Sequence, residues 1–155
     1  MLPQVLGRSS ELLVGWAADG ERVRAGQIYL APPDAHLVLG DDFEWVLDVG
    51  AKCHWTRPAA DPLFISVARS CGPRTLGVVL SGHGVDAAEG AVAIWLAGGT
   101  FLVQDPETCL APEMPSRVRE LGCASLQLDP EVIGDAISTL VMLPGVADHF
   151  RVHAA

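Results

Sequence analysis

The segment over residues 76–90 constrains the fold of this chain more than any other. Residues 76–80 form a continuous apolar run with two adjacent valines, which is typical of a parallel strand covered on both faces. Gly82 and Gly84 follow it, and glycines here let the chain reverse tightly and bring backbone N–H groups close to a ligand. Because α/β folds carry their sites where such a strand ends and a helix begins, we expect the functional site here.

The residues after this turn predict a helix over 86–97. Asp86 has the position and the side chain of an N-cap, and Glu89 stands three residues further on, as in a capping box. Gly98 and Gly99 end the helical pattern. We therefore expect Asp86 to cap the helix that it precedes.

Apolar spacing divides the rest of the chain into further elements. Strand patterns dominate up to residue 49, and from Asp61 onward helix and strand patterns alternate, which predicts a mostly parallel sheet with helices on its faces. The remaining expected elements are a helix tail over 2–6, strands over 12–17 and 27–31, a β-hairpin of 36–39 and 43–49, a loop over 51–56, a helix over 61–70, a strand over 100–104, a helix over 115–121, a strand over 126–128 and a helix from 129 to about 143.

Together these elements predict one α/β domain over residues 1–143, followed by a C-terminal tail over 144–155. The fold class is three-layer, with a mostly parallel, doubly wound sheet and a β-hairpin excursion. The chain has 155 residues, half of them hydrophobic, which is enough to bury a sizeable core.

Charge and composition exclude several classes of function. The formal net charge is −9 and no cluster of Lys and Arg occurs, so we expect no nucleic-acid partner. No apolar run approaches the roughly 20 residues of a membrane span, and the start lacks the pattern of a signal peptide, so we expect a cytoplasmic protein without membrane insertion. Four widely spaced cysteines without a CxxC pair are interpreted as free thiols.

The histidines give no pattern of a metal site. His149 and His153 alone have the i, i+4 spacing that brings two imidazoles together on a helix, and they fall in the expected tail. We therefore expect no metal and no cofactor. A compact triad of Ser81, His83 and Asp86 is also disfavoured, because side chains packed into one strand-to-helix turn usually diverge.

Several stretches, in order and spacing from about residue 2 to 137, resemble the catalytic domain of chemotaxis protein-glutamate methylesterases, the CheB family. Each stretch alone is weakly specific, but the ordered set is specific. They are Asp19-Gly-Glu, Gly-Gln-Ile-Tyr-Leu-Ala-Pro-Pro-Asp-Ala-His-Leu over 26–37, Arg-Pro-Ala-Ala-Asp-Pro-Leu-Phe-Ile-Ser-Val-Ala over 57–68, Gly-Val-Val-Leu-Ser-Gly-His-Gly-Val-Asp over 77–86, Ala97-Gly-Gly-Thr, Gln104-Asp105, Met114-Pro115 and Gly122.

The resemblance implies an enzyme class, a partner and site residues. The family hydrolyses methyl esters of glutamates on chemoreceptors with a Ser-His-Asp triad, in which Asp orients the imidazole and backbone N–H groups stabilise the oxyanion. Asp86 matches the triad aspartate, and His83 stands where the family usually has an oxyanion-hole methionine. Further implied positions are Ser81, Gly82 and Gly84 in the pocket and Arg57, Asp61 and Met114 in shaping the cleft.

The chain also departs from the family pattern. It contains neither the G-x-S-x-G turn of the nucleophile nor the family's Gln-His-Met-Pro type segment, and the matched order begins just after the point where both would occur. Thr56 and Ala59 replace a histidine and a serine common in the family. We therefore expect an N-terminally truncated domain that lacks the first βαβ part of the family fold and keeps only Asp86 of the triad.

Three functions remain open from the sequence. A degenerate homologue would bind a receptor tail or a signalling partner without hydrolysis. An active enzyme would need the serine and histidine from a second chain or from an upstream segment. A non-catalytic interaction module would use the open sheet edge alone, and because such an edge invites association we expect a homodimer or a covering partner.

Overall fold

The computed structural model describes residues 1–142, in which four consecutive strands precede a region of alternating helices and strands. The α-helices are α1 (Leu2–Gly7), α2 (Ala60–Cys71), α3 (Ala88–Leu96), α4 (Glu113–Glu120) and α5 (Pro130–Met142). The strands are β1 (Leu13–Trp16), β2 (Gln27–Leu30), β3 (His36–Leu39), β4 (Trp45–Asp48), β5 (Leu76–Val79), β6 (Thr100–Gln104) and β7 (Leu126–Leu128), and two 3₁₀ helices, η1 (Gly72–Arg74) and η2 (Pro106–Thr108), connect them.

The strands form three hydrogen-bonded groups within the described residues. β5, β6 and β7 are parallel, with Val79 opposite Val103, and β1 pairs in parallel with β2. β3 and β4 form the antiparallel hairpin, with Leu39 opposite Trp45. The expected α/β class with parallel strands and a β-hairpin excursion is confirmed, but β1–β2 and β5–β7 are separate pieces rather than one continuous sheet in this part of the chain.

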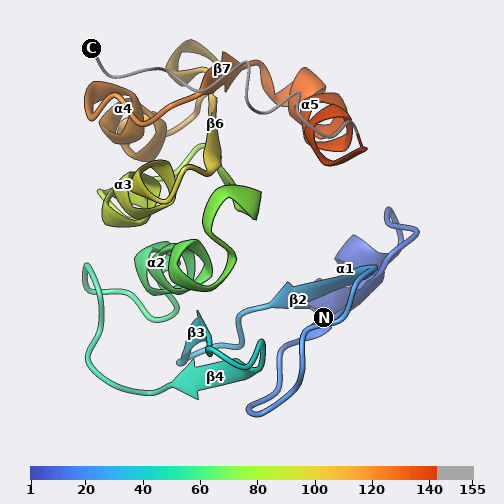
Figure 1. Ribbon diagram of the computed structural model, residues 1–155. Helices are drawn as coiled ribbons and strands as arrows, with labels where there is room; N and C mark the ends of the chain where they lie inside the picture. Colours follow the sequence, from blue (N-terminus) through green and yellow to red (C-terminus); the bar gives the residue numbers. More distant parts are fainter. Residues whose placement is uncertain (143–155) are drawn as a thin grey trace.

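The sheet β5–β7 has helices on both faces. Helices α3 and α4 lie on one face and α5 on the other, which is the doubly wound arrangement (Figure 1). All five residues of β6 are buried, as expected of a strand covered on both sides. Beneath α3 and α4, the side chains of Ile94, Phe101, Val103 and Val118 are fully buried and form the centre of the larger core.

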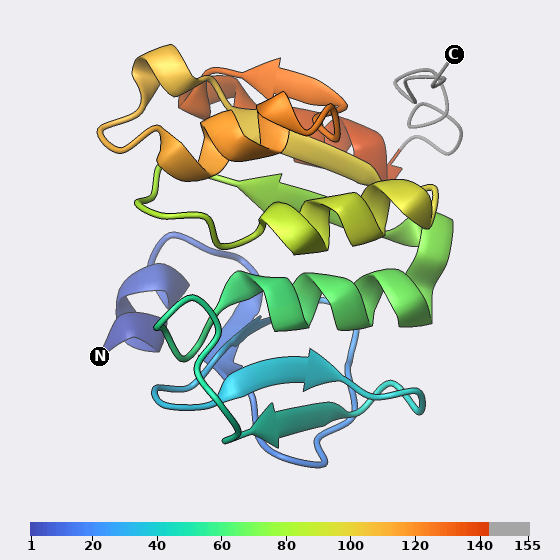
Figure 2. The same ribbon diagram turned by 90° about the vertical axis from the view of Figure 1, so that its left-hand side faces the viewer.

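Helix α2 joins this core to the hairpin. It runs beside α3 and above β3 and β4, as Figure 2 shows. Phe64 packs its ring edge-on against Phe101 with ring centroids 5.4 Å apart, on the side of the larger core. The opposite side of α2 covers a smaller core around Leu39 and Trp45, where Ser66 Oγ accepts a hydrogen bond of 2.9 Å from the Leu39 N–H.

The ends of two helices differ from the sequence-based expectations. Helix α4 begins at Glu113 rather than at residue 115, because a proline in the first turn of a helix removes no hydrogen bond that the helix needs. Helix α3 begins at Ala88, and its N-cap is Ala87 in the left-handed conformation, with φ of 72°. The prediction that Asp86 caps this helix is therefore wrong.

Two further expectations concern the C-terminal tail and membrane-spanning helices. The C-terminal tail expected over 144–155 lies outside the described residues. None of the helices within residues 1–142 is long and apolar enough to cross a membrane.

Candidate functional site

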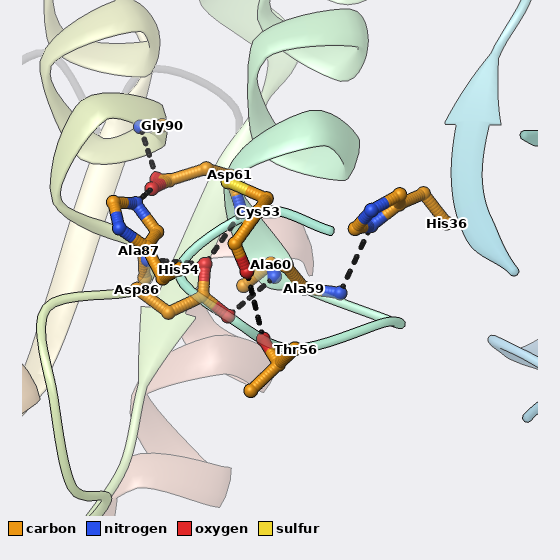
Figure 3. Close-up of polar contacts among 10 residues, drawn as sticks. All are labelled: His36, Cys53, His54, Thr56, Ala59, Ala60, Asp61, Asp86, Ala87 and Gly90. Atoms are coloured by element: carbon orange, nitrogen blue, oxygen red, sulfur yellow. Dashed lines mark hydrogen bonds and ion pairs between the residues drawn. The ribbon is translucent and has the colours of Figure 1, made fainter. Parts of the chain in front are cut away.

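Asp86 caps helix α2 rather than α3. Its carboxylate accepts hydrogen bonds from the backbone N–H groups of Ala60 at 2.7 Å, Asp61 at 3.0 Å and Ala87 at 2.9 Å (Figure 3). The first two are among the N–H groups at the start of α2 that lack a partner within the helix. A carboxylate at this end also interacts favourably with the helix dipole. The turn after β5 thus stabilises a helix that begins 26 residues earlier in the chain.

Asp61 makes the reciprocal contact from α2 to α3. Its side chain is 1% exposed, and one oxygen accepts a hydrogen bond of 2.7 Å from the Gly90 N–H in the first turn of α3. The other oxygen lies 2.9 Å from His54 Nε2. Burial raises the pKa of Asp61, the Gly90 and His54 hydrogen bonds lower it, and the Asp86 carboxylate nearby raises it further. We call the contacts of Asp86 and Asp61 with these two helix starts the α2–α3 junction.

Ser81 and His83 turn to other partners. The Ser81 hydroxyl donates to the Ala111 carbonyl at 3.3 Å and accepts from the Ala111 N–H at 3.0 Å, and so ties the end of β5 to the segment before α4. His83 is 85% exposed, and its Nδ1 lies 3.1 Å from a carboxylate oxygen of Glu113. The side chain of Asp86, which is part of the α2–α3 junction, hydrogen-bonds to neither Ser81 nor His83. The divergence expected from the sequence is therefore what the structure has, and these three side chains form no local triad.

A pocket of about 440 Å³ opens beside Asp86. One wall is the turn after β5, which carries His83 and Asp86, and the opposite wall is the loop between β4 and α2, which carries Trp55. The Trp55 side chain is 93% exposed. The full lining comprises His54, Trp55, Thr56, Pro58, His83, Gly84, Val85, Asp86 and Met114. The pocket thus lies at the carboxyl end of β5, where the sequence predicted the site.

Gly82 and Met114 hold one side of this pocket. The Gly82 N–H donates to the Ala111 carbonyl at 2.9 Å, and the Gly82 carbonyl accepts from the Met114 N–H at 3.1 Å. A Cβ atom added at Gly82 would lie 2.5 Å from the Met114 sulfur, so the thioether packs directly on the glycine backbone. Gly84 has φ of 90°, a conformation that strongly favours glycine. Both glycines therefore have a structural reason to be glycine.

Arg57 anchors the loop that forms the opposite wall. Its guanidinium donates to Asp34 at 2.7 and 3.1 Å, to the Val49 carbonyl at 2.6 Å and to the Gly50 carbonyl. This contact with Arg57 lowers the pKa of Asp34. Neither Arg57 nor Asp61 lines the pocket; each fixes a segment that does.

Sequence reasoning missed the role of His54. The Cys53 and Thr56 backbones exchange hydrogen bonds of 3.2 and 2.9 Å, which closes a tight turn and directs His54 to Asp61. The potential ligand atoms of Cys53, His54 and Asp61 all lie within 4.8 Å of one another, a set that could hold a metal ion. A histidine-only search for metal ligands overlooks such a set because its members are of three residue types.

His36 is a buried histidine with a structural role. It is 2% exposed, with Nδ1 accepting from the Ala59 N–H at 3.2 Å and Nε2 lying 3.1 Å from the Ala51 carbonyl. Since Nδ1 accepts, the proton lies on Nε2. His36 holds both ends of the loop between β4 and α2 from beneath.

Comparisons with known proteins agree with one another. A model of the CheB methylesterase family matches residues 1–137. A protein-glutamate methylesterase/protein-glutamine glutaminase of Symbiobacterium thermophilum is 39% identical over 140 residues, which are 90% of this chain and 39% of that protein. A second such protein, of Caulobacter vibrioides, is 39% identical over 142 residues, which are 89% of this chain and 41% of that protein.

A solved structure gives the same result. The crystal structure of the Thermotoga maritima CheB methylesterase catalytic domain matches with a TM-score of 0.87 and 36% sequence identity, covering 90% of this chain and 76% of that chain. This chain therefore has that fold over most of its length, and it spans about two fifths of the curated relatives.

Proposed function

Because the chain belongs to the CheB methylesterase family, we propose that it serves chemotaxis signalling by binding methylated glutamate segments of chemoreceptors in the pocket beside Asp86. The observation that carries this proposal is the position of Asp86, the residue that matches the family's triad aspartate, in the wall of a pocket of about 440 Å³. A cytoplasmic location is part of the same proposal. Membership of the CheB family supports a chemoreceptor as partner, and the names of the relatives support a protein glutamate ester as the group bound.

Asp86 has the capacity to orient a histidine in addition to capping α2. An ionised carboxylate offers about four acceptor sites, and three are taken by backbone N–H groups. The remaining site suffices for the Nδ1–H of an imidazole, which is the bond that a triad aspartate makes. The described residues offer no such imidazole, since His83 pairs with Glu113 and His54 with Asp61.

The turn after β5 also has the features of an oxyanion site. Within residues 1–142, the hydrogen bonds of the structure leave the backbone N–H groups of His83 and Gly84 without an acceptor. Both residues line the pocket. Such N–H groups stabilise a developing oxyanion when they point at the reacting carbonyl.

From these points we infer that the chain by itself recognises the methyl ester without hydrolysing it. Hydrolysis would require a serine and a histidine beyond the side chains described here, from a second chain or from a neighbouring segment. In this proposal, residues 1–142 supply Asp86 and the turn of a CheB-type site but neither its nucleophile nor its base.

Binding to a methylated chemoreceptor fragment tests the proposal. Isothermal titration calorimetry with methylated and unmethylated fragments is expected to give tighter binding of the methylated form. Trp55→Ala removes the most exposed aromatic side chain of the pocket and is expected to weaken binding about tenfold. Leu110→Ala, at a side chain that is also fully exposed but lies outside the pocket, is the matched control and is expected to change nothing. Absence of binding at high concentration would refute the proposal.

A second candidate is a non-catalytic interaction module that uses open strand edges. Within residues 1–142, β1 and β5 each pair with another strand on one edge only. Leu13, the first residue of β1, is 74% exposed, and Leu80, the residue after β5, is 51% exposed. Unpaired edges with apolar side chains favour association, and a homodimer is the simplest form of it. Light scattering of the wild type and of Leu13→Lys tests this: the module requires a dimer that the lysine disrupts, and a monomer at micromolar concentration would exclude it.

A further inference from the structure

We propose that Cys53, His54 and Asp61 form a binding site for a divalent transition metal of the Zn²⁺ type, with a coordination position left open for water. The three side chains supply a sulfur, an imidazole nitrogen and a carboxylate oxygen, all within 4.8 Å of one another. Figure 3 shows them converging between the loop before α2 and the first turn of that helix. The inference is independent of the proposed receptor binding.

The distances between these donors suit a tetrahedral ion after small shifts of the side chains. Zn–N, Zn–O and Zn–S bonds of about 2.0–2.3 Å place neighbouring ligand atoms roughly 3.3–3.8 Å apart. His54 Nε2 and the Asp61 oxygen are 2.9 Å apart at present, with a proton between them. On binding, the metal takes the place of that proton, which moves to Nδ1 of the neutral imidazole, while the Cys53 thiol releases its own proton to solvent.

The surroundings fix the ligands as they do in established metal sites. The second oxygen of Asp61 accepts the Gly90 N–H at 2.7 Å, so the carboxylate is held in one orientation by a backbone group behind it. Such outer contacts orient metal-binding carboxylates and histidines. The hydrogen bonds between Cys53 and Thr56 close the turn that presents the thiol and the imidazole on the same side. The side chain of Asp61 is 1% exposed, so this ligand lies in a low-dielectric environment.

Charge around the site favours a cation. The carboxyl groups of Asp61, Asp86 and Glu89 lie close enough to the Cys53 thiol to act on it electrostatically. The same three negative groups would stabilise a divalent ion at this place.

The donor set selects the kind of metal. Thiolate and imidazole ligands suit Zn²⁺ and its neighbours among the transition metals, whereas Mg²⁺ and Ca²⁺ prefer oxygen donors. Three protein ligands are the number found where zinc keeps a water molecule in its fourth position. His54 also lines the pocket beside Asp86, so such a water would lie near the pocket wall.

Co²⁺ is the probe that reports the ligands directly. Titration of the reduced full chain with Co²⁺ is expected to produce a thiolate-to-cobalt charge-transfer absorption, and Zn²⁺ is expected to remove it by displacement. Cys53→Ser is expected to abolish the band, and Asp61→Asn to weaken Zn²⁺ binding by tenfold or more in calorimetry, with circular dichroism to verify folding. Cys109→Ser, which removes another partly buried thiol, is the matched control and is expected to retain both signals.

The opposite results are equally clear. Absence of Zn²⁺ binding at about 10 μM, or equal binding by Cys53→Ser and the wild type, would overturn the proposal. The double variant His149→Ala/His153→Ala tests whether the metal binds at this pair of histidines instead of at His54. It is expected to bind Zn²⁺ as the wild type does. Loss of binding in this variant would place the metal at His149 and His153. Rapid alkylation of Cys53 that Zn²⁺ does not slow would also count against the site and in favour of a reactive thiol.

Discussion

At the α2–α3 junction two carboxylates hold backbone N–H groups on neighbouring helices, whereas the turn over residues 81–85, immediately before it in the chain, faces mostly solvent. Asp61 is 1% exposed and Asp86 accepts three backbone hydrogen bonds. In the turn, His83 is 85% exposed and its side chain contacts a half-exposed Glu113. The junction therefore fixes the fold, and the turn is available to a ligand.

The difference gives Asp86 a structural role that does not depend on a histidine partner. A carboxylate that caps a neighbouring helix contributes to stability whether or not a histidine is present. His83, the exposed side chain of the turn, has no such stabilising role. We therefore expect substitutions at the junction to act mainly on stability and those of His83 mainly on binding.

The largest effect is expected where α3 approaches α2 most closely. In Gly90→Ala the new Cβ would overlap Cβ of Phe64, an atom that moves only with the backbone of α2. Overpacking of this kind costs about 1–3 kcal/mol, and we expect the upper end because the contact is with a backbone-linked atom. Urea denaturation measures the free energy of unfolding. The control is Gly134→Ala in α5, where nothing lies within 4 Å and alanine is expected to stabilise by about 0.5–1 kcal/mol. Equal effects at the two glycines would contradict the close packing.

Asp86→Ala is expected to have the next largest effect. It removes the acceptor for three backbone N–H groups, and loss of a capping side chain costs about 0.5–2 kcal/mol. We expect about 2 kcal/mol by thermal or urea unfolding, with a smaller loss in Asp86→Asn, which keeps one acceptor oxygen. The control is Glu89→Ala, at an exposed acidic residue in the first turn of α3. It is expected to change the free energy of unfolding by no more than about 0.5 kcal/mol. A large effect of Glu89→Ala would mean that α3, rather than α2, depends on an acidic cap.

Within the turn itself, Ser81→Ala and His83→Ala are expected to separate. Ser81 exchanges two hydrogen bonds with the Ala111 backbone, so its loss is expected to cost about 1 kcal/mol. His83→Ala is expected to leave the free energy of unfolding within about 0.5 kcal/mol, since surface substitutions rarely do more. Chemical denaturation of the two variants side by side tests this order. If His83→Ala were the more destabilising, the turn would be part of the fixed framework.

The smallest expected effect concerns acid stability on the far side of the pocket. Contact with Arg57 lowers the pKa of Asp34 below its ordinary value of 3.8 in the folded chain. The unfolded chain then binds more protons in this range, so the contribution is present above the ordinary pKa and is lost as pH falls through the folded one. Asp34→Asn is expected to flatten this part of the curve of stability against pH, measured by urea unfolding at acidic pH. An unchanged slope would show that the exposed pair contributes nothing measurable.

Most secondary structure could be predicted because the apolar pattern is local. The β5 run of Leu76–Val79 and the hairpin around residues 40–42 need no information from elsewhere in the chain. The pocket at the end of β5 follows from the general position of sites in α/β folds. The helical spacing of 61–70 likewise gave α2, with ends one residue apart from those observed.

The errors concern contacts that the local sequence pattern does not specify. From the sequence, Asp86 resembles an N-cap of α3, the helix that follows it. The chain bends at Ala87, however, and the Asp86 carboxylate contacts the start of α2 instead. The pairing of His54 with Asp61 depends in the same way on a turn whose conformation at His54, with φ of 48°, the sequence does not reveal. Local propensity cannot specify which helix start lies next to a given carboxylate; tertiary packing does.

Release of methanol from a methylated chemoreceptor fragment shows whether Asp86 acts as a helix cap beside a binding pocket or as part of a hydrolytic site. We expect the chain to bind the fragment and to release no methanol above the buffer rate. Methanol release that disappears in Asp86→Asn, while that variant stays folded, would contradict it. Such a result would mean that this chain contains, or assembles with a second copy to form, a complete hydrolytic site around Asp86.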